Sequence, residues 1–279
     1  MPVDLHIHST ASDGTLTPEE IVAEGKRLGL FAIALTDHDS VEGVTPALNA
    51  AREIGGIHVF GAVEMSVDIR DREIHVLGFF VDVEHKPLLE ATAKIRASRL
   101  ERGAEMVRRL ADLGIPITME DVEAEAGEGS MGRPHVANAL VKVGAVKTAH
   151  EAFDKYLVRG KPGYVARYKL EPQESVKLIL DAGGMPVMSH PGLCRCDDMI
   201  DVLRPDGLLG IECYHIDHSP TEARKYVKMA RSRGMYITGG SDSHGPRGPV
   251  PVEIGAVWVP DECAVKLMEW ADEKGRPYV

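Results

Sequence analysis

Two histidines separated by one residue lie at the start of the chain, in the segment DLHIHSTASDG. His6 and His8 alternate with Leu5 and Ile7, a pattern that predicts a strand. Because the side chains of a strand alternate between its two faces, both imidazoles point to the same side. An apolar core gains nothing from two neighbouring imidazoles, whereas metal ions bind well to them. Asp13 follows shortly and could add a carboxylate.

Further polar residues follow other segments that read as strands. They lie at or near the carboxyl ends of these strands, where β/α barrels build their active sites. Imidazoles gathered there without partners would be costly to desolvate and would repel one another once protonated. A bound cation removes both problems, so we predict a polynuclear metal centre. Its candidate ligands are His6, His8, Asp13, His38, Glu64, His75, His190, Asp242 and His244.

The types of donor narrow the choice of metal. Imidazole nitrogen and carboxylate oxygen, without thiolate, suit Mn, Fe, Zn or Co rather than a structural zinc site built from cysteines. Six imidazoles and three carboxylates are more than one ion can bind, so two or three ions are expected, with one carboxylate as a bridge. Three divalent ions would outweigh the charges of Asp13, Glu64 and Asp242 and would attract a dianion such as phosphate, even in a chain of net charge −11.

Single residues of this set also have ordinary structural explanations. A lone histidine after a strand is often a capping or core residue, Asp37 could cap the helix that follows it, and Glu64 could be a charge at a hairpin edge. The joint pattern favours the metal centre, because half of the twelve histidines fall on one predicted rim beside acids.

The elements that must position these residues alternate between strand and helix. Apolar runs predict strands in VDLHI, FAIALTDHD and IHVFGAVE, a hairpin turning at Arg70-Asp71, and further strands in GMPVMSHPG, GLLGIECYH, MYITGGSDSHG and EIGAVWVP. One helix is expected from about Thr17, where a proline and two acids follow, and another over 41–53. This alternation predicts an α/β fold with a largely parallel sheet.

The middle of the chain is different, with helical periodicity from about residue 87 to 160 and no convincing strand. The stretch GEGSMGRPH interrupts this pattern, and two shorter helices are expected after it. We therefore predict an all-helical insertion over residues 96–164, between two parts of one α/β domain, 1–95 and 165–279. The apolar faces of its first helices are marked by Leu88, Ile95, Leu100, Met106, Val107 and Leu110.

Composition limits the classes of location and partner. The 279 residues contain no recognisable signal peptide and no apolar run near the roughly 20 residues that span a bilayer, so we expect a cytoplasmic protein without membrane association. The four cysteines form no C-x-x-C pair, and Cys194 and Cys196 are expected to be free thiols. The net charge of −11 disfavours stable binding of duplex nucleic acid, which depends on many Lys and Arg contacts.

The motifs HIHSTASDG, TDHDS, SHPG and SDSHG, with Glu64 and His75 between them, together resemble the PHP-domain (polymerase and histidinol phosphatase) phosphoesterases over nearly the whole chain. This resemblance implies a distorted (β/α)7 barrel and a centre of three divalent ions, with Mn²⁺ as the first expectation and Fe²⁺ or Zn²⁺ as alternatives. It also implies the ligand sets, which are His6, His8, Glu64 and Asp242 for one ion, Glu64, His75 and His190 for a second, and Asp13, His38 and His244 for the third.

The helical insertion resembles the branch of this family that acts on nucleotides and short RNA. Its matching segments are Arg133-Pro134-His135 and Arg159-Gly160-Lys161-Pro162-Gly163-Tyr164, which the resemblance implies as substrate contacts. Pro134 suits the first position of a helix, helix N-termini bind anions, and an arginine can fork onto a phosphate. A surface arginine, a hydrogen-bonded histidine and a solvated loop are the plain alternatives.

A third polar segment, YHIDHS, follows a predicted strand. Tyr214, His215 and His218 are candidates to line the pocket, and a core or surface position is equally open for each.

The expected reaction is the hydrolysis of a phosphate monoester, on a nucleoside 3′,5′-bisphosphate or at the 5′ end of a short RNA. A hydroxide between metal ions held by Glu64 would attack phosphorus, Arg133 and His135 would grip phosphate oxygens, and His218 or metal-bound water would protonate the leaving group. A histidinol-phosphate phosphatase, an amidohydrolase and a non-enzymatic metal-binding accessory module are the alternatives.

Overall fold

The computed structural model describes residues 2–69, 72–126, 132–166, 168, 170–248 and 251–279. The chain forms two compact units, one of Met1–Thr92 with Leu170–Val279 and one of Ala93–Lys169. The insertion predicted over 96–164 lies inside the second unit, and its limits stay a prediction. In the described chain, no helix is both long enough and apolar enough to cross a bilayer.

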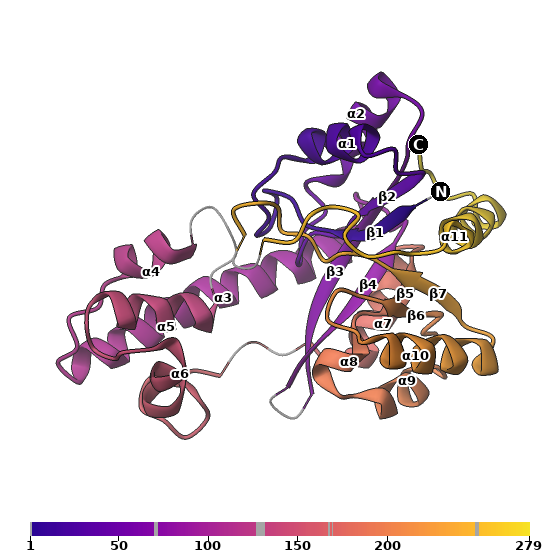
Figure 1. Cartoon of the computed structure of the whole chain (residues 1–279). Helices are drawn as coiled ribbons and strands as arrows, with labels where there is room; N and C mark the ends of the chain where they lie inside the picture. Colours follow the sequence, from indigo (N-terminus) through magenta and orange to yellow (C-terminus); the bar gives the residue numbers. More distant parts are fainter. Residues whose placement is uncertain (1, 70–71, 127–131, 167, 169, 249–250) are drawn as a thin grey trace. The chain divides into compact units, whose positions relative to one another are not determined.

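A single seven-stranded sheet forms the centre of the first unit, with its strands in sequence order (Figure 1). All neighbouring strands are parallel, except that β4 runs antiparallel to β3 and β5. The sheet nearly closes, because the amide of His8 donates to the carbonyl of Ser243, 2.9 Å away, beyond the end of β7. This arrangement confirms the expected distorted (β/α)7 barrel. The strands are β1 Val3–Ile7, β2 Ala32–Leu35, β3 His58–Ile69, β4 Arg72–Phe79, β5 Met185–Met188, β6 Gly210–Tyr214 and β7 Tyr236–Gly239.

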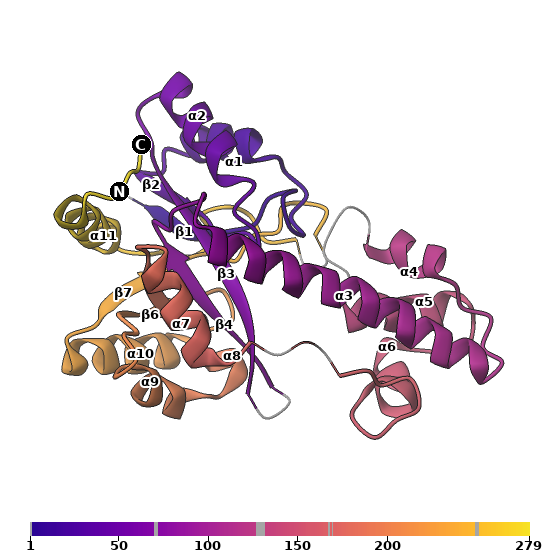
Figure 2. The ribbon, with the colours of Figure 1, turned by 180° about the vertical axis from the view of Figure 1, so that it is seen from behind.

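Helices cover the outside of this barrel, and the two chain ends lie close together (Figures 1 and 2). The first helix begins where the sequence predicts, because Thr17 and Glu20 form a capping box in which each side chain accepts the other's backbone N–H. The helices of this unit are α1 Pro18–Arg27, α2 Val44–Ile54, α7 Pro172–Asp181, α8 Pro191–Cys194, α9 Asp197–Leu203, α10 Pro220–Arg233 and α11 Asp261–Lys274.

The alternation along β1 separates the core from the site. Val3, Leu5 and Ile7 pack outward in apolar clusters with the surrounding helices and strands. His6 and His8 take the other face and are also fully buried. The strand is therefore covered on both sides, by apolar packing outside and by polar contacts inside the barrel.

The second unit is helical and has its own core. Most of α3 (Lys86–Asp112) belongs to it, followed by α4 (Met119–Ala126), α5 (Arg133–Lys142), α6 (Ala149–Ala152) and the π-helix η1 (Phe153–Leu157). Five of the six apolar residues that mark the predicted helical faces are buried. The sixth, Leu100, is 57% exposed. The core of this unit includes Met106, Leu110, Val122, Val136, Leu140 and Leu157.

Two expectations about the backbone and the cysteines of the first unit are wrong. The segment EIGAVWVP is not a strand, because Gly255 takes a φ of +77° and its N–H donates to Asp4 Oδ2 at 2.7 Å, which turns the chain there. Cys194 and Cys196 form a disulfide instead of two free thiols. Arg195 between them has a φ of +50°, and the two Cα atoms are 5.3 Å apart.

Candidate metal centre

The two histidines of β1 converge on one point with two carboxylates. Nε2 of His6 and Nε2 of His8 are 3.1 Å apart. Glu64 Oε2, from β3, lies 3.3 Å from the first nitrogen and 3.4 Å from the second. Asp242 Oδ1, from the loop after β7, lies 3.4 and 2.9 Å from the same two atoms. These four side chains form one group that could hold an ion.

Glu64 also faces a second set of imidazoles. Its Oε1 lies 3.0 Å from Nδ1 of His75 and 3.1 Å from Nε2 of His190, and its Oε2 lies 3.0 Å from Nδ1 of His38. Nδ1 of His75 and Nε2 of His190 are 3.3 Å apart. The carboxylate is fully buried and stands between the two groups of histidines, which suits a bridging ligand.

A third group of donors surrounds Asp13. Its carboxylate oxygens lie 3.4 Å from Nε2 of His244, 3.7 Å from Nδ1 of His8 and 3.9 Å from Nε2 of His38. His8 therefore lies within reach of two groups, and His38 is within reach of both Glu64 and Asp13. All nine candidate ligands predicted from the sequence lie in this one cluster.

Several polar atoms of the cluster lack ordinary hydrogen-bond partners. Glu64 Oε2, Asp242 Oδ1, His8 Nδ1 and His38 Nδ1 are buried, and none of these atoms has a hydrogen bond among the described residues. A buried polar atom left in this way costs free energy, so such atoms are rare unless something else binds them. The donors are nitrogen and carboxylate oxygen aimed at shared points, which fits divalent cations.

Charge within the cluster keeps its carboxylates ionised. Burial alone would raise the pKa of Glu64, but the imidazoles of His75, His38 and His6 outweigh burial and hold it well below its usual range. The pKa of Asp242 is held low in the same way, against burial, by His6, His215 and His8. An ionised carboxylate is the form that binds a metal.

The sequence profile of the PHP domain matches residues 4–126. The chain is 36% identical over 252 residues to a 3′,5′-nucleoside bisphosphate phosphatase of Chromobacterium violaceum, covering 88% of this chain and 87% of that protein. The chain belongs to the PHP-domain phosphoesterases. It is also 31% identical to the 5′-3′ exoribonuclease Rnm of Escherichia coli, covering 92% of this chain and 89% of that protein. A solved structure from Bifidobacterium adolescentis, described as a metal-dependent phosphoesterase, superimposes with a TM-score of 0.79 at 31% identity and covers 96% of this chain and 97% of that one.

A buried acid that sequence reasoning missed supports this PHP centre from behind. Glu212 of β6 accepts hydrogen bonds from the backbone N–H of His190 (2.8 Å) and from Ser189 Oγ (3.2 Å), and its Oε1 lies 2.9 Å from Nδ1 of His6. The available signal was an acid inside the apolar strand GIECY. A carboxylate behind a ligating histidine fixes its ring and raises its basicity.

Two further buried acids anchor the loops that carry PHP ligands. Asp37 accepts hydrogen bonds from the N–H and Oγ of Ser9 and from Oγ of Ser12, at 2.6–2.7 Å, and so holds the loop before Asp13. It does not cap the next helix, whose N-cap is Gly43.

Asp4 anchors the loop that carries Asp242. It accepts hydrogen bonds from the N–H and Oγ of Ser241, at 2.8 and 2.6 Å. Asp242 itself takes a φ of +54°, which is unusual for a residue other than glycine. Such strain persists only where surrounding contacts impose it.

Of the two histidines predicted from YHIDHS, one lies at the PHP centre. Nε2 of His215 lies 3.3 Å from Asp242 Oδ2, and its Nδ1 accepts the N–H of Asp217, so the ring holds the carboxylate in place. The contacts of the other histidine, His218, do not support its expected role as the proton donor. Its Nδ1 lies 3.0 Å from the carbonyl of Cys213 and its Nε2 accepts the N–H of Gly192, so neither nitrogen is left to protonate a leaving group.

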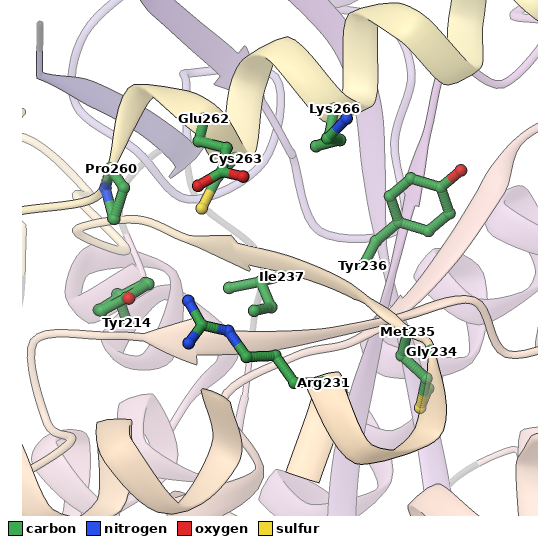
Figure 3. Close-up of a pocket in the computed structure, with 10 residues that line it drawn as sticks. All are labelled: Tyr214, Arg231, Gly234, Met235, Tyr236, Ile237, Pro260, Glu262, Cys263 and Lys266. Carbon is green, nitrogen blue, oxygen red and sulfur yellow. The ribbon is translucent and has the colours of Figure 1, made fainter. Parts of the chain in front are cut away.

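The expectation that Tyr214 lines the substrate pocket is not supported either, because its side chain points away from the PHP centre. Its ring lines a pocket on the outside of the barrel together with Arg231 and Pro260 (Figure 3). The register of β6 against β7 shifts between Glu212 and Tyr214. This irregularity breaks the strand's alternation, so the two side chains end on opposite faces.

The predicted substrate residues of the insertion lie in the second unit. Arg133 opens α5, and His135 accepts the N–H of Gly132 at its Nδ1, 3.0 Å away. Arg159, Lys161 and Tyr164 lie in the turns after η1, where the carbonyl of Tyr164 accepts a hydrogen bond of 2.6 Å from Arg109. Their role in substrate binding stays a prediction.

Proposed function

We propose that this PHP-domain phosphoesterase hydrolyses phosphate monoesters of nucleotides. Its substrates would be nucleoside 3′,5′-bisphosphates, short RNA carrying a 5′-phosphate, or both. The observation that carries the proposal is the convergence of nine nitrogen and oxygen ligands around the buried Glu64. The names of the two relatives, each similar over nearly nine-tenths of its length, support nucleotides as the substrate class.

We propose that this centre binds three divalent cations. Mn²⁺ is the favoured metal, and Fe²⁺ or Zn²⁺ are the alternatives. When bound, such ions lower the pKa of a coordinated water and neutralise charge on phosphate oxygens. The ions would be held by His6, His8, Glu64 and Asp242, by Glu64, His75 and His190, and by Asp13, His38 and His244.

The chain's own residues would then orient both reactants. Glu64 ties together the two sets of histidines, and His215 and Glu212 hold Asp242 and His6 in their orientations. Water is excluded from the back of the centre, because Glu64, His6 and Glu212 are completely buried. Buried, fixed charges act more strongly on a reacting phosphate than charges in water do.

Arg133 and His135 would bind a phosphate at the start of α5. An arginine forks onto two phosphate oxygens, and a helix N-terminus favours an anion. Nδ1 of His135 accepts the N–H of Gly132, which fixes the orientation of the ring at the start of α5. We propose Arg159, Lys161 and Tyr164 as further substrate contacts of this unit.

The test is a panel of phosphate esters assayed with and without added Mn²⁺. Adenosine 3′,5′-bisphosphate, AMP, histidinol phosphate, p-nitrophenyl phosphate and a 5′-phosphorylated RNA pentamer cover the alternatives. We expect metal-dependent release of phosphate or nucleotide, with the highest kcat/KM on the bisphosphate or the RNA. Preference for histidinol phosphate would overturn the substrate class, and inactivity on every ester with full metal content would favour an accessory metal-binding module.

A further inference from the structure

A groove runs along α10 on the outside of the barrel unit. The helix contributes Arg224, Lys228 and Arg231 to it, and the opposite wall carries Tyr214 and Trp258. The groove lies on the outer face of the sheet, whereas the metal ligands lie inside the barrel. None of its residues belongs to the centre described above.

The aromatic wall of this groove is open to solvent. Trp258 is 72% exposed, while Trp270, the other tryptophan of the chain, is 7% exposed. The ring of Tyr214 stands edge-on to Trp258, with 6.2 Å between centroids. An exposed tryptophan offers a flat apolar face that a planar ring can cover.

The facing wall is cationic. Helix α10 holds five lysines and arginines and a single acid, in a chain of net charge −11. Two of the five point elsewhere, since Lys225 pairs with Asp197 and Arg233 pairs with Asp201. Arg224, Lys228 and Arg231 follow one another at helical spacing along the groove, and none of them joins an ion pair in the described part of the chain.

A second hollow continues the groove toward α11. Tyr214 and Arg231 line both hollows, and Tyr236, Lys266 and one acid, Glu262, line the further one, whose cavity volume is about 350 Å³ (Figure 3). In this view the guanidinium of Arg231 extends into the space between Tyr214 and β7. Because the two hollows share Tyr214 and Arg231, they form one track of aromatic and mainly cationic side chains, in which Lys266 is paired with Glu269.

We propose that this track binds single-stranded nucleic acid, with a base stacked on Trp258 and successive phosphates held by Arg224, Lys228 and Arg231. Alternating aromatic and cationic contacts are how proteins bind single strands without reading sequence. The track lies on the outer side of β6, and Tyr214, which lines both of its hollows, is followed directly by His215, whose ring bonds Asp242 on the inner side. The inference rests on the proposed function, in which it holds the part of an RNA substrate that is not being cleaved.

Substitutions in the aromatic wall and in the cationic wall should affect binding in different ways. Stacking of one base contributes about 1–3 kcal/mol, so Trp258→Ala should weaken binding about 5- to 140-fold. Each phosphate contact on a single strand contributes about 0.7 to the slope of log K against log salt concentration. Lys228→Ala should therefore reduce that slope by about this amount, and Trp258→Ala should leave it nearly unchanged.

The experiment measures binding of a fluorescein-labelled, phosphorothioate-linked oligouridylate 10-mer by anisotropy, with the metal-loaded protein and at several salt concentrations. The phosphorothioate linkages slow hydrolysis, so binding is read without turnover. Quenching of tryptophan emission gives a second readout, which Trp258→Phe removes if the base stacks there. Lys225→Ala is the matched control, since it removes the same charge from the same helix outside the groove.

Equal affinity of wild type, Trp258→Ala and Lys228→Ala for the 10-mer would overturn the proposal, and so would an absence of binding. Binding of phosphatidylglycerol vesicles in place of the 10-mer would also overturn it and would assign the track to an anionic lipid surface. Turnover of adenosine 3′,5′-bisphosphate, measured separately, distinguishes failure of this inference from failure of the proposed function.

Discussion

The carboxylate of Glu212 stands directly behind the ring of His6. Its Oε1 lies 2.9 Å from Nδ1, while Nε2 of the same ring faces Glu64 and Asp242. Burial would raise the pKa of Glu212, but His6 and its neighbours lower it to about 2. An ionised carboxylate only accepts hydrogen bonds, so Nδ1 carries the proton and Nε2 presents its lone pair to the centre.

Glu212→Gln should therefore weaken metal binding with little change in fold. Loss of a partner behind a metal-ligating histidine typically costs about 10- to 100-fold in metal affinity. Competition with a chelator, followed by metal analysis, measures this directly. Glu222→Gln is the control, because it removes one carboxylate charge at the start of α10, where Glu222 contacts Ser219 and no ligand ring. Equal metal affinity of Glu212→Gln and wild type would contradict the positioning role.

Glu64→Gln tests whether the carboxylate of Glu64 is a bridging ligand between two metal ions. The change keeps the size of the side chain but removes the negative charge between two sets of histidines. We expect loss of bound metal and a fall in turnover by orders of magnitude, with unchanged circular dichroism. Glu222→Gln, at an exposed helix start, controls for the loss of one charge. A Glu64→Gln protein with full metal content and near wild-type turnover would rule out bridging.

His6 and His8 should behave as one unit, since their Nε2 atoms are 3.1 Å apart and share the same two carboxylates. Effects of residues that act together are strongly non-additive. The double alanine variant should then be little worse in kcat/KM than either single variant. If the two losses multiply, the histidines serve separate tasks.

Arg133→Ala should discriminate between substrates. A charge-assisted bond to phosphate contributes about 1.5–3 kcal/mol, or roughly 10- to 150-fold in kcat/KM. We expect a loss of that size on adenosine 3′,5′-bisphosphate and a much smaller one on p-nitrophenyl phosphate, which has no second phosphate. Arg108→Ala, which removes an exposed arginine paired with Glu105 in the same unit, serves as the control. Equal losses on both substrates would place Arg133 at the reacting phosphate.

His218→Ala should act on stability rather than on proton transfer. Both ring nitrogens bond to backbone groups, and burial lowers the pKa of this histidine. Leaving buried backbone groups without partners costs about 1–3 kcal/mol, so thermal unfolding should shift to a lower temperature. The shape of the pH–rate profile should stay the same. If the variant's pH–rate profile lost its alkaline limb, His218 would be the proton donor after all.

The sequence alone determined the nature of the centre, because the relevant signals are local. Alternation along Val3–Ile7 separates apolar from imidazole side chains within a single strand. His6, Glu64 and His75 lie within β1, β3 and β4, and the remaining ligands follow β1, β2, β5 and β7, whose parallel carboxyl ends meet at one rim. Thus donors from His6 to His244 could be assigned to one centre without coordinates.

Only the tertiary structure decided what stands behind and beside these ligands. Glu212 meets His6 across 206 residues, and the direction of Tyr214 depends on a register shift against β7. The turn at Gly255 depends on a hydrogen bond to Asp4, 251 residues away. Hydrogen bonds between distant segments and the register of paired strands leave no periodic trace in the residues that make them. The local pattern therefore predicted the ligands. Long-range pairing decided which residues hold those ligands in place and which side chains lie on the outer face of the barrel.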